Sequence, residues 1–126
     1  MAKSKPANTV QRKFISDMCK FVNIHGLGVI YGSEYEGSTY EMHHALGRSA
    51  KHNKVAIGHE FVFPVPFELH HVLSNHSDNV THFKHNFTKR FGNQRDIWEE
   101  FYNGMQVAGY TVPSVEVYYA IMDTRA

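Results

Sequence analysis

The sequence predicts an α+β domain, and three observations support this. Apolar residues recur at helical spacing near the N-terminus, two apolar segments flank a polar basic loop in the middle, and further stretches of helical periodicity follow. The length of 126 residues suits one domain, and 42% apolar residues argue against a disordered chain. We expect a flexible basic tail at residues 1–8 and a single domain over residues 9–126.

The first part of the domain is expected to contain one helix and one strand. Asn8 or Thr9 can cap a helix over about residues 9–22. Residues 27–41 combine β-branched and aromatic residues with glycines, which is typical of an irregular loop that leads into a strand. Residues 40–44 form that strand.

A second strand is expected after the basic loop at residues 47–54. It covers about residues 59–65, and two strands joined by such a loop predict a hairpin. Pro64 and Pro66 should close this strand, because proline cannot donate a hydrogen bond to a ladder.

Three helices are expected beyond the hairpin, at residues 66–75, 80–91 and 93–108. Asn79 lies where a side chain can cap the second of them. The final stretch, residues 110–121, could form a strand docked on the domain.

The composition excludes several classes of protein. Cys19 is the only cysteine, so an internal disulfide framework and a cysteine-based zinc cluster are excluded. No apolar run approaches the ~20 residues of a membrane span, and no apolar stretch follows the charged N-terminus as in a secretory signal. We therefore expect a cytoplasmic protein with no membrane partner.

Histidine is the residue type that points to chemistry. Nine of the ten histidines lie between residues 43 and 85, and they include the doublets His43-His44 and His70-His71. Imidazole is the commonest metal ligand and a general base near neutral pH. A single histidine is more often a solvent-exposed polar residue, but clustering makes that explanation weaker here.

The first doublet lies at a strand end, where neighbouring imidazoles can divide two tasks. One can bind a cation while the other faces a water molecule, if the strand frays, and Gly47 close behind permits this. A metal that cuts a phosphodiester needs few protein ligands, so that water and phosphate can bind. A second ligand would come from the helix packed on the hairpin, where His70 lies.

Three segments resemble those of the HNH, or ββα-metal, nucleases, and most closely the phage recombination-enhancement (Ref-type) nucleases. They are EMHHALGR (41–48), HEFVFPVPFELH (59–70) and THFKHNFTKRFG (81–92), and the likeness covers about residues 27–108. The resemblance implies a ββα-metal finger core flanked by an N-terminal helix and C-terminal helices. It also implies a phage-encoded, metal-dependent DNA endonuclease of recombination or DNA processing, in the host cytoplasm, whose partners are DNA and a recombinase filament.

The resemblance assigns a role to each of four histidines. His43 would bind the metal, and His44 would be the general base that takes a proton from the attacking water. His59 would occupy the middle position of the HNH motif and orient that base, and His70 would be the ligand from the helix. The implied cofactor is one divalent ion, which could be Mg²⁺, Mn²⁺, Ni²⁺ or Zn²⁺.

A further metal ligand is left open between three residues. His82 fits best by its distance from the Phe-Gly ending at residues 91–92, His76 is next, and Asn75 is the third option.

The family's structural zinc is not expected in this chain. Members usually carry two Cys-x-x-Cys pairs, and the matching positions here are Val29 and Gly32, then Pro66 and Leu69. None of these side chains binds zinc, so apolar packing should replace the metal.

Charge is distributed unevenly along the chain. Residues 1–54 carry eight Lys or Arg and four Asp or Glu, whereas residues 55–126 carry five and eight. In the basic part, Arg48 and Lys51, with Lys54, are expected to contact the phosphate backbone of DNA.

Two other functions fit the same residues. A non-catalytic DNA-binding metal finger would keep the basic loop without cleavage. A phage interaction protein would use its histidines to bind a metal at a subunit contact.

Overall fold

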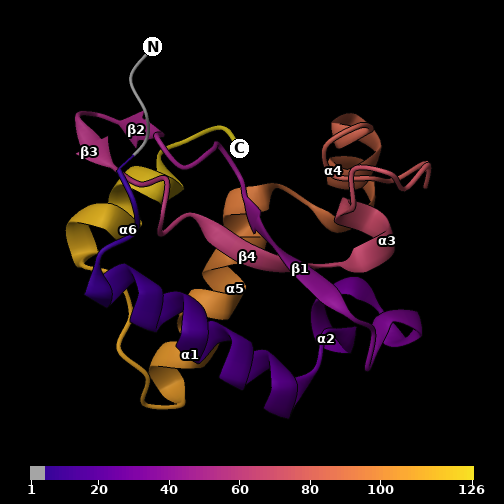
Figure 1. Ribbon diagram of the computed structural model, residues 1–126, viewed down its shortest axis with the longest axis horizontal. Helices are drawn as coiled ribbons and strands as arrows, with labels where there is room; N and C mark the ends of the chain where they lie inside the picture. Colours follow the sequence, from indigo (N-terminus) through magenta and orange to yellow (C-terminus); the bar gives the residue numbers. More distant parts are fainter. Residues whose placement is uncertain (1–4) are drawn as a thin grey trace.

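The computed structural model describes residues 5–126 and has an α+β fold (Figure 1). The first four residues of the predicted tail lie outside the described residues. The strands are β1 (Tyr40–His44), β2 (Lys51–His52), β3 (Val55–Ala56) and β4 (Val62–Pro66). The helices are α1 (Thr9–His25), α2 (Gly28–Tyr31), α3 (Phe67–His70), α4 (Lys84–Phe91), α5 (Gln94–Val107) and α6 (Val115–Met122), with a 3₁₀ helix at Ser33–Tyr35.

The predicted pairing of two strands around the basic loop is confirmed. β1 and β4 are antiparallel, with His44 opposite Val62. The second strand continues through Pro64 to Pro66, although the prolines were expected to close it. A two-stranded sheet has an open edge where a proline nitrogen needs no partner, and at this edge the Pro64 carbonyl accepts a hydrogen bond from the Tyr31 hydroxyl at 2.7 Å.

The basic loop contains a second, smaller sheet that the sequence analysis did not predict. β2 and β3 pair across a turn at Asn53 and Lys54, which have φ values of 51° and 67°. The hairpin is held against the C-terminal end of α6, because the Asp123 carboxylate contacts Nε2 of His52 at 2.9 Å and accepts a hydrogen bond from Asn53.

The core forms around β4, whose five residues are all buried. α1 and α5 both pack against this strand (Figure 1). The predicted apolar face of α5 is confirmed, since its members are buried: Ile97, Trp98, Phe101, Tyr102 and Met105. The first helix begins as predicted, with Asn8 and Gln11 forming a capping box, and it extends three residues further, to His25.

Of the positions where the nuclease family has cysteines, only one pair is packed in the core. Pro66 and Leu69 are buried, whereas Val29 is 88% exposed and Gly32 is exposed as well. Apolar packing therefore occupies the place of the second cysteine pair only.

Four predicted elements differ from the structure. The helix expected over residues 80–91 begins only at Lys84, and the Asn79 side chain accepts hydrogen bonds from the amides of Thr81 and His82 in the turn before it. Residues 27–41 contain α2 and a 3₁₀ helix instead of an irregular loop. The helix expected over residues 66–75 is one turn, because the Leu69 carbonyl accepts a hydrogen bond from the amide of Val80 at 2.7 Å. The strand expected within residues 110–121 is wrong, since this stretch contains α6.

No helix within residues 5–126 combines the length and the apolar character that a bilayer crossing requires.

Candidate functional site

The candidate site lies where β1, α3 and the start of α5 meet. His43, on β1, is buried, and its Nε2 lies 2.8 Å from Oε1 of Gln94, the first residue of α5. Burial lowers the pKa of His43 to about 4, so the ring is neutral at pH 7. A neutral ring that donates from Nε2 to Gln94 carries its lone pair on Nδ1.

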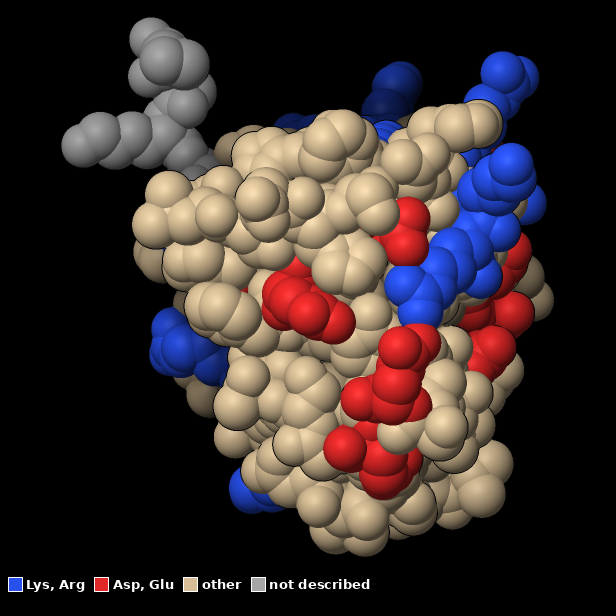
Figure 2. Space-filling view, turned by 90° about the vertical axis from the view of Figure 1, so that its right-hand side faces the viewer, with Lys and Arg blue, Asp and Glu red and all other residues tan. Residues whose placement is uncertain are grey.

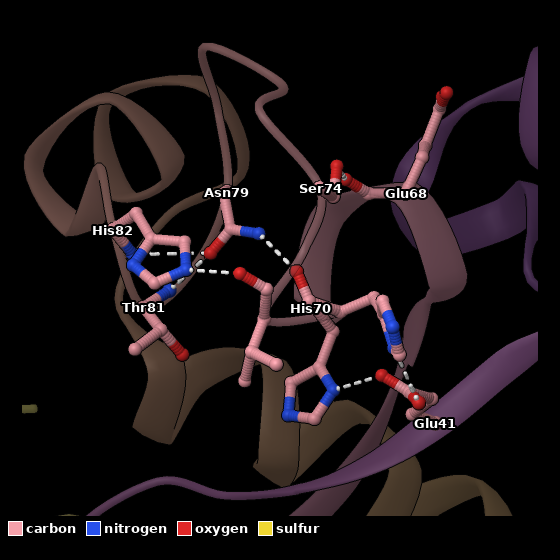
Figure 3. A network of polar contacts seen from close by, with 9 residues as sticks. Glu41, Glu68, His70, Ser74, Asn79, Thr81 and His82 are labelled. Carbon is pink, nitrogen blue, oxygen red and sulfur yellow. Dashed lines mark hydrogen bonds and ion pairs between the residues drawn. The ribbon is translucent and has the colours of Figure 1, made fainter.

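His70 is oriented by a carboxylate on the neighbouring strand. Its Nδ1 donates to Oε1 of Glu41 at 2.7 Å, and Nδ1 of His71 lies 3.2 Å from the other oxygen (Figure 3). The hydrogen bond from His70 lowers the pKa of Glu41, which keeps the carboxylate charged. Nε2 of His70 is then the nitrogen that can accept a proton or bind a cation.

The rings of His43 and His70 are close enough to share an ion. Their centres are 5.1 Å apart and their planes meet at 71°. A nitrogen that binds a transition metal at about 2.0–2.1 Å puts its ring centre roughly 3 Å from the ion, so two ligating rings have centres up to roughly 6 Å apart. Two imidazoles also suit several first-row metals. The ring separation therefore lies within the range of two imidazoles that bind one divalent cation.

His44 follows on the same strand and is suited to accept a proton. It is half-buried, and burial, followed by the charge of Arg48, lowers its pKa below the ordinary value of 6.5. The ring is therefore neutral at pH 7 and has a free lone pair.

His59 lies beside His44, but its hydrogen bond goes elsewhere. The two ring centres are 6.4 Å apart, and Nε2 of His59 donates to the backbone carbonyl of Lys5 at 2.5 Å. The nuclease resemblance implies that His59 orients the base. In the structure its hydrogen bond instead fastens the N-terminal segment to the site.

Within residues 5–126, neither His82 nor His76 forms a three-residue metal-binding group with His43 and His70. Nε2 of His82 donates to the carbonyl of Val72 at 2.9 Å, and Figure 3 shows this ring directed at that carbonyl. Nδ1 of His76 accepts a hydrogen bond from the amide of Asp78, so its lone pair is in use.

Asn75, the remaining option, is exposed. Within residues 5–126 there is no group of three or more His, Cys, Asp or Glu side chains arranged to hold a metal. The candidate centre therefore has two protein ligands.

Of the three predicted phosphate contacts, Arg48 lines a pocket beside the histidines, and Lys51 and Lys54 do not. Arg48 lines a pocket together with His44 and His59. Lys51 and Lys54 lie on the β2–β3 hairpin and line none of the pockets around the histidines.

The face that carries α3 and α4 is electrostatically mixed. Figure 2 shows acidic side chains next to basic ones there, and uncharged residues cover most of it. Arg90, on α4, donates to Asp78 at 2.9 Å and is also bonded to Glu34. This arginine is therefore engaged within the fold.

Sequence reasoning missed several residues of this site. Glu41 and Gln94 hold the two candidate ligands, and Lys5 and Lys84 line pockets beside His44. The acidic residue two places before the His doublet was a visible signal for Glu41. Lys5 belongs to the basic excess of residues 1–54, which the charge distribution had already marked for phosphate contact, whereas Gln94 and Lys84 carried no signal.

The comparisons with known proteins add no family to these observations. No protein-family model matches the sequence, and neither a curated protein nor a solved structure is significantly similar to it.

Proposed function

We propose that this protein is a divalent-metal DNA endonuclease in which β1, β4 and α3 form a ββα-metal core. The observation that carries the proposal is the 5.1 Å separation of the His43 and His70 rings, with His44 next in sequence. The strand pair and the turn of helix that follows β4 directly occur in the order that such a core requires.

Nδ1 of His43 and Nε2 of His70 would hold the metal, which as a Lewis acid would stabilise the charge that develops on the phosphate and on the leaving oxygen. Gln94 and Glu41 hold the two rings from their opposite nitrogens. Such outer contacts fix the tautomer and direction of a ligating histidine.

His44 would take a proton from the water molecule that attacks phosphorus. This requires a neutral imidazole, which its lowered pKa provides at pH 7. General-base assistance of this kind contributes roughly 10²–10⁴ in rate. His44, rather than His43, has this role because it is only half-buried and lines two open pockets.

A plasmid-nicking assay with Mg²⁺, Mn²⁺, Ni²⁺ or EDTA tests the proposal. We expect cleavage with at least one metal and none with EDTA. His44→Ala should fold and bind metal and DNA, yet cut at least roughly 10²-fold more slowly. His70→Ala should lower metal affinity in a calorimetric titration. His85→Ala is the matched control, because His85 is exposed on α4.

Three results separate this proposal from its alternatives. Cutting by His44→Ala at the wild-type rate would remove His44 from the mechanism. Salt-sensitive DNA binding without cleavage in any metal would indicate a DNA-binding module. Metal-dependent self-association without DNA affinity would indicate an interaction protein. Including single-stranded, duplex and recombinase-coated DNA in the assay tests the expected link to recombination.

A further inference from the structure

Two pockets meet at His44. The first, with a volume of about 510 Å³, is lined by His44 together with Lys5, Arg48 and His59. The second, of about 270 Å³, is lined by His44 together with His43, Thr81 and Lys84. His44 therefore has Lys5 and Arg48 beside it in the first pocket and Lys84 beside it in the second.

The lining of both pockets suits an anion. Neither is lined by an Asp or Glu side chain, and Lys5, Arg48 and Lys84 are exposed. None of the acidic side chains within residues 5–126 forms an ion pair with these three cations, in contrast to Lys13, which is bonded to Asp17 at 2.7 Å. Their charges are therefore available to a ligand.

The N-terminal segment is built into the first pocket. The Lys5 carbonyl accepts the hydrogen bond from His59 at 2.5 Å, and the Ala7 carbonyl accepts one from Arg12 at 2.5 Å. Asn8 then caps α1. These backbone contacts fix Lys5 at the wall of the pocket, although residues 1–8 were expected to form a flexible tail.

We propose that one DNA strand crosses His44, with a phosphate on one side of the scissile bond held by Lys5 and Arg48 and a phosphate on the other side held by Lys84. A strand that fills both pockets must pass His44, because His44 lines both. Arg48 can bind phosphate through two parallel hydrogen bonds, and the lysines act as point charges. The inference rests on the proposed endonuclease function and adds where the substrate backbone lies.

The test is DNA binding measured by fluorescence anisotropy in EDTA, so that no cleavage occurs. The probes are a single-stranded oligonucleotide and its duplex, titrated over a range of salt concentrations. We expect Lys5→Gln and Lys84→Gln each to weaken binding several-fold and to reduce the slope of log affinity against log salt by about 1, the effect of one lost phosphate contact. Both losses should add in the double variant.

Lys89→Gln is the matched control, because Lys89 is an exposed lysine on α4 that lines neither pocket. Its salt slope should equal that of the wild type. The hydrogen bond from His59 is retained in Lys5→Gln, since it goes to the backbone. Thermal unfolding should therefore be unchanged in all variants.

The outcomes distinguish this inference from the proposed function. Wild-type slopes in both Lys5→Gln and Lys84→Gln would overturn the strand path, and metal-dependent nicking by those variants would leave the endonuclease proposal standing. Reduced slopes in Lys5→Gln and Lys84→Gln, combined with a wild-type protein that never cuts DNA, would support the strand path and overturn the endonuclease proposal. A wild-type protein that binds no DNA would overturn both.

Discussion

At the scale of single residues, Glu41 decides how the candidate ligands are held. One carboxylate contacts Nδ1 of both His70 and His71, and so it ties the end of α3 to β1. His71 is also stacked on Phe67, with ring centres 4.4 Å apart. These contacts engage His71 within the fold, and Nε2 of His70 remains without a partner among the described residues.

Glu41→Gln should weaken binding of a divalent metal by roughly 10- to 100-fold, the usual effect of losing a carboxylate behind a ligating histidine. An amide offers one oxygen and one NH₂ group in place of two oxygens, so one of the two rings loses the acceptor that it now contacts. Calorimetric titration with Mn²⁺ or Ni²⁺ at pH 7 measures the effect. Glu68→Gln, an exposed residue of α3, is the control. Equal dissociation constants for Glu41→Gln and the wild type would contradict this role.

At the scale of elements, the loop between β1 and β2 is shaped by a close approach of two backbones. A Cβ atom on Gly58 would lie 2.1 Å from the carbonyl oxygen of Arg48. The amide of Gly58 also donates to the carbonyl of Ala50 at 3.2 Å. Glycine at residue 58 therefore allows the Arg48 loop to pack beside His59.

Gly58→Ala should lower the free energy of unfolding by about 2 kcal/mol or more, because overpacking against backbone forces the loop to move. Gly47→Ala is a matched comparison in the same loop. Gly47 has φ +86°, and a Cβ atom added there would have no atom within 4 Å. Gly47→Ala should therefore lower the free energy of unfolding only by the backbone strain, about 1 kcal/mol. Urea denaturation measures both. A smaller loss for Gly58→Ala than for Gly47→Ala would show that the loop yields without cost.

At the scale of the whole molecule, the contact between His43 and Gln94 joins β1 to α5. Both side chains are buried, so the neutral state of His43 is coupled to the folded state. Charging this imidazole would place a cation among the apolar residues of the core. The stability of the metal-free protein should therefore depend on pH through this residue.

The direction of this pH dependence follows from the number of protons that the folded and unfolded states bind. The pKa of His43 is about 4 in the folded protein, against 6.5 for an ordinary histidine. The unfolded chain binds more protons between these values, so stability is complete above pH 6.5 and falls as the pH approaches 4, by roughly 3 kcal/mol in all. Urea denaturation in EDTA from pH 4.5 to 7.5 measures this. His43→Gln should show a shallower dependence than the wild type, and parallel curves would contradict the assignment.

Local patterns were sufficient for the elements with strong periodicity. The apolar spacing of residues 97–105 predicted both the helix α5 and its buried face, and the capping residue Asn8 located the start of α1. The order of strand, loop, strand and helix likewise placed His43 near His70. These features depend on residues that are neighbours along the chain or within one hairpin.

Long-range contacts decided the rest. Apolar residues after Pro113 suit a strand, yet the Ser114 side chain caps a helix whose Ala120 and Ile121 are buried in the core. The helix expected at residues 66–75 is one turn long. The amide of Val80 donates to the carbonyl of Leu69, which a second helical turn would have used.

The surroundings of the candidate site show the same division. The histidine doublets were visible in the sequence, and so was their chemistry. The tertiary structure alone decided where three further residues lie. Gln94 contacts His43, Lys84 lines the same pocket as His43, and the backbone of Lys5 is bonded to His59. These residues are brought to the site by packing over many tens of residues, and no local spacing encodes that.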